Sequence, residues 1–172
     1  LLQSNFMPEQ VLHREAELKQ IANILAPALR KERPSNLFIY GNTGTGKTLT
    51  VKHVTENMVF VANKKHIPLK HIYVNCKLKR VADTEYRLIA HLSSFFGRSI
   101  PPTGLPTEDV YKIFYESIER EKSVVLLVLH EIDQLVKKTG DNILYNLTRI
   151  NEELKHSQIS IVGISNDTTF ME

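Results

Sequence analysis

The sequence contains little cysteine and no long hydrophobic run. Cys76 is the one cysteine among 172 residues, so an internal disulfide is excluded. The longest apolar run covers Val124 to Leu129, far below the roughly 20 residues that a membrane span requires. The charged first residues include no apolar stretch typical of a secretory signal. These absences favour a cytoplasmic protein with no membrane partner.

Neither end of the sequence is typical of a complete chain. It begins with Leu1 rather than Met, and it stops at Glu172 just after a strand-like run. We therefore expect a fragment, with further chain beyond both ends. Its composition, 42% hydrophobic and 24% charged, excludes a disordered or fibrous chain and predicts one globular domain.

Positive charge is concentrated in one stretch of the sequence. The net charge is +3, but the segment from Lys64 to Arg98 carries eight basic and two acidic residues, a net +6. A basic surface of this kind attracts phosphate backbones, although a solvated Lys/Arg face is the commoner meaning of such a run.

Short β-branched runs alternate with longer amphipathic segments. This order predicts an α/β fold in three layers, with a parallel sheet flanked by helices on both faces. The expected strands are 37–40, 71–75, 124–129 and 159–164, and the expected helices are 15–29, 47–63, 84–96, 107–120 and 141–155.

A glycine-rich segment follows the first expected strand. The residues from Gly41 to Thr48 fit the pattern G-x-x-x-x-G-K-[ST] and open the next helix. In such a loop the backbone N–H groups surround a phosphate, the lysine reaches the β- and γ-phosphates, and the hydroxyl binds Mg²⁺. A glycine-rich turn could match by accident, but the flanking strand and helix favour a nucleotide site holding ATP or ADP with Mg²⁺.

Polar residues follow the two later strands. Glu131 comes directly after the apolar run 124–129 and His130, and Asn166 follows the strand 159–164. Ligands of open α/β sheets bind at the carboxyl ends of the strands, so Glu131 could activate water there and Asn166 could hold that water or the γ-phosphate. The alternatives are a surface acid and an ordinary turn asparagine.

These motifs together resemble a known family. The loop GNTGTGKT, the strand end HEID, the run LYNLTRINEEL and the closing GISND are similar to the AAA+ ATPase domain of archaeal-type origin-recognition and helicase-loading proteins. That family is related to the eukaryotic origin-recognition subunits. The resemblance covers the whole chain, 1–172. It implies that these residues form a three-layer P-loop core that ends after the first sensor residue.

The resemblance implies roles for individual residues. Lys47, Glu131 and Asn166 would be the catalytic lysine, the water-polarising acid and the first sensor. Thr48 would bind Mg²⁺, with His130 at the second metal position. The nucleotide would lie against the adenine wall and the phosphate loop, formed by Val11, Leu12, His13, Arg14, Asn42, Thr43, Gly44, Thr45, Gly46, Lys47, Thr48 and Leu49.

The segment 80–106 resembles the family's insertion that contacts and deforms origin DNA. It coincides with part of the +6 stretch, and the resemblance makes Arg80, Arg87 and Arg98 the expected contacts to double-stranded DNA. A packed crossover with an exposed basic face is the alternative.

Two departures from the family pattern stand out. The family has Asp before the catalytic Glu, whereas this chain has His130, which offers no negative charge to magnesium-bound water. The helical lid and the winged-helix domain of the family do not fit within the 172 residues. We therefore expect weak magnesium binding and little turnover.

Several reactive residue types have no expected role in the chemistry. Cys76 is expected to be a strand-end packing residue, because no companion motif activates it. Arg149 is expected to anchor its helix. Five other histidines lack the mutual spacing of metal ligands and are expected at the surface or at its rim: His53, His66, His71, His91 and His156.

Three functions remain open on the sequence. The first is the ATP-binding module of a DNA replication initiator, nucleoid-associated, which recognises origin DNA, helps load the replicative helicase with other initiator subunits and hydrolyses ATP slowly. The second is a nucleotide-locked regulatory or structural subunit without turnover. The third is a clamp-loader-like AAA+ NTPase with no DNA contact of its own.

Overall fold

The described residues form a parallel four-stranded sheet between two layers of helices. The computed structural model describes residues 15–41 and 46–166. Its strands are β1 (Leu37–Tyr40), β2 (Leu69–Asn75), β3 (Val124–His130) and β4 (Gln158–Ser165), in the spatial order β1-β4-β3-β2. The predicted three-layer α/β class is therefore confirmed.

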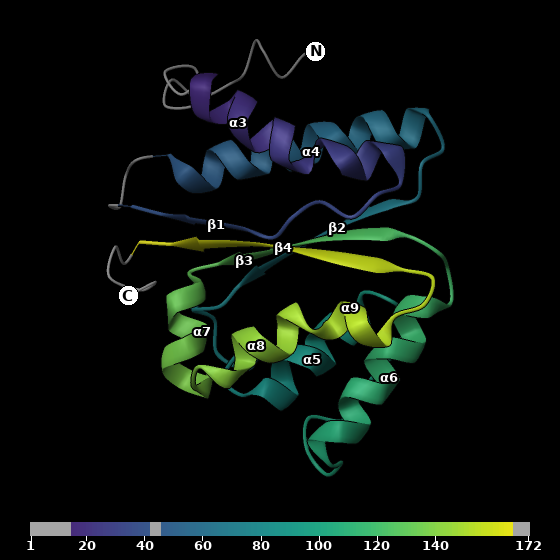
Figure 1. Cartoon of the computed structure of the whole chain (residues 1–172). Coiled ribbons are helices and arrows are strands. Elements are labelled where there is room, and N and C mark those ends of the chain that lie inside the picture. Colours follow the sequence, from purple (N-terminus) through teal and green to yellow (C-terminus); the bar gives the residue numbers. More distant parts are fainter. Residues whose placement is uncertain (1–14, 42–45, 167–172) are drawn as a thin grey trace.

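One layer of helices covers the face of the sheet that carries the phosphate-loop helix. It contains α3 (Glu15–Leu25), the short 3₁₀ helix η1 (Ala26–Arg30) and α4 (Lys47–Lys64) (Figure 1). Val51, Val54 and Met58 recur at helical spacing on α4 and are buried. They belong to one apolar cluster with Leu126 and Val128 of β3. This packing holds the start of α4, and with it the end of the phosphate loop, against the sheet.

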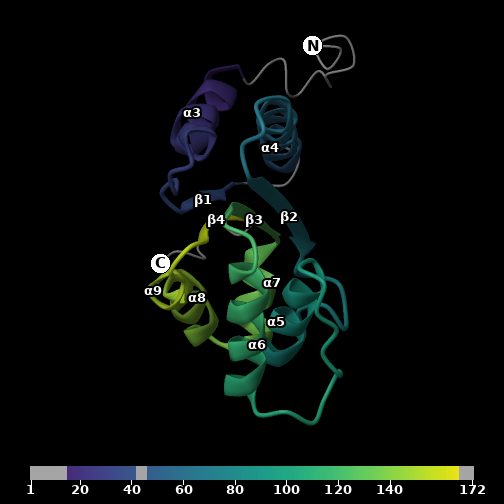
Figure 2. The same ribbon diagram turned by 90° about the vertical axis from the view of Figure 1, so that its right-hand side faces the viewer.

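The other layer covers the opposite face. It contains α5 (Glu85–Ser94), α6 (Thr107–Glu119), α7 (Ile132–Thr139), α8 (Asn142–Thr148) and α9 (Ile150–Glu153) (Figures 1 and 2). Leu88, Phe114 and Leu135 of this layer are fully buried in a cluster that includes Leu127 and Leu129 of β3. Because β3 is covered on both faces, its residues 124–129 are all buried, as the apolar run predicts.

The structure corrects two expected helices and adds a third that was not expected. The helix expected over 15–29 ends at Leu25, because Pro27 opens the 3₁₀ turn that follows. The helix expected over 141–155 is divided into α8 and α9 at Arg149. Helix α7 was not predicted, since its eight residues begin inside the strand-end motif.

Strand register brings the functional ends together. His130 pairs with Asn75 of β2 and Ile164 of β4, while Tyr40 pairs with Ser165. The carboxyl ends of all four strands therefore lie along one edge of the sheet. None of the helices in residues 15–41 and 46–166 combines the length and the apolar character that crossing a bilayer requires.

Candidate nucleotide site

The phosphate-loop motif lies between β1 and α4. The Gly41 N–H donates to the Ser165 carbonyl at 3.2 Å, which ties the start of the loop to the end of β4. Gly46 precedes α4 with φ 81°, in the left-handed region that glycine adopts without strain. The N-terminus of α4 is thus positioned at the carboxyl edge of the sheet, where a phosphate would meet its N–H groups.

The residues at the start of α4 differ in how far their side chains are exposed. Lys47 is buried, and its Nζ donates to the Gly41 carbonyl at 2.9 Å. Thr48 is half-buried and Leu49 is exposed. The expected nucleotide contacts at 42–45 and at 11–14 lie outside the described residues.

Glu131 occupies the turn between β3 and α7. Its backbone has φ 58° and ψ 49°, a left-handed conformation that costs energy for a residue with a Cβ. Strain of this kind is often found at functional sites. The geometry places Glu131 at the carboxyl edge of the sheet, as the strand-end motif predicts.

Asp133 has a structural partner that the sequence did not reveal. It is 6% exposed, and its Oδ1 accepts a hydrogen bond from the Ser165 hydroxyl at 3.0 Å. This contact joins the first turn of α7 to the end of β4. Asn166, the expected sensor, follows directly and is exposed.

His130 is held by a tyrosine of the neighbouring strand. Its Nδ1 lies 2.8 Å from the Tyr73 hydroxyl, and the Lys52 Nζ lies 4.4 Å from the centre of the Tyr73 ring. Burial lowers the pKa of His130, and the ammonium groups of Lys52 and Lys47 also lower it, against the opposing effect of Glu131. These effects together favour the neutral form of the imidazole.

The metal site expected from the motif is incomplete. Thr48 supplies a hydroxyl, but position 130 supplies an imidazole engaged by Tyr73 in place of a carboxylate. In the described ranges no three His, Cys, Asp or Glu side chains are grouped to hold a metal ion. The residues present fit Mg²⁺ only in part.

Two of the three expected DNA contacts lie together. Arg80 and Arg87 line a cavity of about 500 Å³. Arg87 pairs with Asp83 at 3.5 Å, and the pKa of that carboxyl is lowered first by a hydrogen bond from the Arg80 backbone N–H. Arg98 lies in the turn after α5, where its N–H donates to the Ser93 carbonyl.

Cys76 and Arg149 lie as expected, whereas His71, expected at the surface or its rim, is half-buried with its Nε2 3.4 Å from the Thr55 hydroxyl. Cys76 is fully buried, and burial raises the pKa of its thiol to about 12, so it is a packing residue. Arg149 pairs with Glu152 at 3.2 Å and lies over the Tyr145 ring, within its own helical segment.

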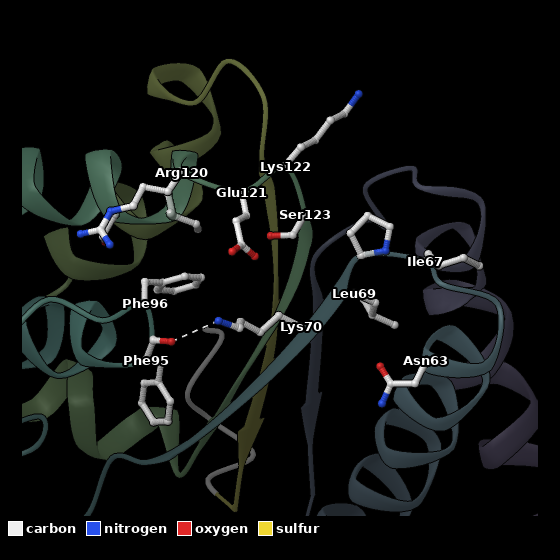
Figure 3. Close-up of a pocket in the computed structure, with 13 residues that line it drawn as sticks. Asn63, Ile67, Leu69, Lys70, Phe95, Phe96, Arg120, Glu121, Lys122 and Ser123 are labelled. Carbon is white, nitrogen blue, oxygen red and sulfur yellow. Dashed lines mark hydrogen bonds between the residues drawn. The ribbon is translucent and has the colours of Figure 1, made fainter.

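A separate cavity opens at the amino ends of β2 and β3. It has a volume of about 390 Å³, and Figure 3 shows Lys70 at its centre, with Nζ donating to the Phe95 carbonyl at 3.1 Å. Arg120 and Lys122 lie at its rim (Figure 3). Because it lies at the opposite end of the strands from Glu131, it is not part of the nucleotide site.

Comparison with known proteins agrees with this geometry. Residues 10–159 match the family model of the AAA ATPase domain. The ORC1-type DNA replication protein of Pyrococcus furiosus is 46% identical over 176 residues, covering all of this chain and 41% of the relative. That of Methanosarcina mazei is 43% identical over 172 residues, again covering the whole chain and 41% of the relative.

A solved structure gives the same result. The Aeropyrum pernix ORC1 protein in complex with DNA matches with a TM-score of 0.83 and 41% identity, over 93% of this chain and 40% of that one. This chain thus spans about two fifths of the length of these relatives. It belongs to the AAA ATPase domain family and is similar along its whole length to part of the ORC1-type DNA replication proteins.

Proposed function

We propose that this chain is the ATP-binding module of a DNA replication initiator that recognises origin DNA. The observation that carries the proposal is the convergence of the α4 start, Lys47 and Glu131 at one edge of the sheet. The relatives supply the biological setting, because they include ORC1-type replication proteins that match the whole chain. Other initiator subunits, the replicative helicase and a nucleoid location belong to the same proposal.

Nucleotide binding would depend on the loop and α4. Backbone N–H groups and the Lys47 ammonium would bind the phosphates of ATP or ADP, while residues 11–14 would contact the adenine. Thr48 would contribute a hydroxyl to Mg²⁺, which neutralises phosphate charge when bound. Glu131 would polarise the attacking water and Asn166 would sense the γ-phosphate.

DNA binding would use the segment 80–106. Arg80 and Arg87 lie on one cavity after the carboxyl end of β2, and Arg98 follows α5. Arginine contacts to phosphates release counterions, so duplex affinity should fall steeply with added salt. Fluorescence anisotropy on a labelled duplex over a salt series tests this part.

A nucleotide-locked subunit is the second candidate. It is favoured by the hydrogen bond between Tyr73 and His130, because His130 stands at the position where the family has an aspartate. Multiple-turnover phosphate release separates the two functions, since only the first predicts turnover. A mass measurement of nucleotide retained after purification, with and without EDTA, tests binding itself. If the protein neither retained nucleotide through purification nor bound added nucleotide, both candidate functions would be contradicted.

A further inference from the structure

Tyr73, Lys52 and His130 form a polar cluster beside the phosphate site. Thr48, Lys52 and Thr55 recur at i, i+4 and i+7 on α4, so they share one face of that helix. Thr55 lies 3.4 Å from His71 of β2, and Lys52 lies over the Tyr73 ring, so this face is turned toward β2. Followed toward the N-terminus of α4, the same face leads from Thr55 and Lys52 to Thr48, in the direction of the carboxyl end of β2, whose last residue, Asn75, pairs with His130.

The chemistry of the Tyr73–His130 contact sets its direction. A phenol hydroxyl is a good donor, and an unprotonated imidazole nitrogen is a good acceptor. When the Tyr73 hydroxyl donates to Nδ1 across the 2.8 Å that separates the oxygen and the nitrogen, a neutral ring carries its own hydrogen on Nε2.

We propose that Tyr73 holds His130 as the Nε2–H tautomer, so that position 130 donates a hydrogen bond to a nucleotide phosphate oxygen. This inference rests on the proposed nucleotide function and deepens it. A carboxylate at the same position would repel phosphate and would require a cation between them. An N–H donor attracts phosphate directly, so the site would hold nucleotide without a metal ion.

The tautomer can be measured without any nucleotide. Nitrogen-15 NMR of histidine-labelled full-length protein should show His130 Nδ1 unprotonated and Nε2 protonated, with the signals assigned by a His130→Gln variant. Tyr73→Phe removes the donor and should shift the Nδ1 resonance. Tyr86→Phe is the matched control, because the Tyr86 hydroxyl donates to the remote Pro101 carbonyl. A protonated Nδ1 in the parent protein would overturn the inference.

The phosphate contact is tested by ADP affinity in excess EDTA and in saturating Mg²⁺. The parent protein should bind ADP about equally in both conditions. In His130→Asp, the affinity for ADP should be roughly tenfold lower in EDTA than in Mg²⁺. This ratio corresponds to about 1.4 kcal/mol. Tyr73→Phe should weaken binding in EDTA by a smaller factor and leave binding in Mg²⁺ unchanged.

The two possible failures are distinguishable. If the parent protein bound no ADP in either condition, the proposed function would be wrong and the phosphate contact with it. If it bound ADP tightly, but His130→Asp and Tyr73→Phe showed the parental ratio between the two conditions, only the phosphate contact of His130 would be wrong.

Discussion

The two ends of the central strands use the same kinds of side chain in different ways. At the amino end, the Glu119 carboxylate accepts backbone N–H groups from Lys155, His156 and Ser157 at 2.7 to 3.2 Å. At the carboxyl end, no hydrogen bond from within residues 15–41 and 46–166 reaches the Glu131 carboxylate. A carboxylate saturated by backbone donors stabilises a loop, whereas one without them is available to a ligand.

Lys47→Ala is the strongest test of nucleotide binding at the carboxyl ends of the strands. Loss of the ammonium should weaken ATP and ADP binding by at least about 100-fold, because a charge-assisted contact to phosphate is removed. Stability should fall by about 1 kcal/mol or more, because the hydrogen bond from Lys47 to the Gly41 carbonyl is lost. Calorimetry measures the first effect and denaturant unfolding the second. Lys65→Ala, just past the same helix, is the control, and unchanged affinity in Lys47→Ala would contradict the site.

His130→Asp in the full-length protein should increase hydrolysis. A carboxylate would favour the metal that neutralises charge in the transition state, and a gain of ~3 kcal/mol corresponds to roughly two orders of magnitude in rate. Single-turnover hydrolysis at saturating Mg²⁺ compares the two proteins. Equal rates would show that His130 does not limit the chemistry.

Glu119→Gln tests the amino end through stability rather than binding. The pKa of Glu119 is lowered: burial raises it, but the N–H donors of Ser157, Lys155 and His156 outweigh that effect. Its contribution is therefore present above the unfolded pKa and is lost as pH falls through the folded pKa. We expect a loss of about 1 to 2 kcal/mol at neutral pH that disappears in acid.

Denaturant unfolding across pH measures this difference, with Glu116→Gln on the exposed face of the same helix as control. Nucleotide affinity should not change. If Glu119→Gln lost nucleotide binding without losing stability, the amino end of the strands would not be the purely structural end that we propose.

Removing Arg80, Arg87 and Arg98 together should have the smallest effect. Duplex affinity at low salt should fall by about tenfold or less, with a shallower salt dependence, because three phosphate contacts are removed. The control removes equal charge at the amino end, by replacing three other basic residues with alanine: Lys65, Arg120 and Lys122. Equal losses in both triple variants would show that the segment 80–106 is not the specific contact.

The sequence predicted the parts of the site that lie within one motif. The phosphate-loop motif and the place of Glu131 after β3 could be predicted because each adjoins a clear strand or helix, while their roles toward nucleotide stay predictions. The contacts of Asp133 with Ser165 and of Tyr73 with His130 were not found, since they depend on strand register between segments 32 and 57 residues apart. Helix α7 was missed because eight residues give too short a period to detect.

The strand order has a consequence for synthesis. In the described ranges β1 is hydrogen-bonded to β4, although β2 and β3 are both made between them. Pairing over so long a stretch of chain is slow, because the loop must close before any contact forms. The Gly41 N–H at the end of β1 therefore gains its partner, the Ser165 carbonyl, only after β4 has been made, so nucleotide capture during synthesis would report that β4 has joined β1.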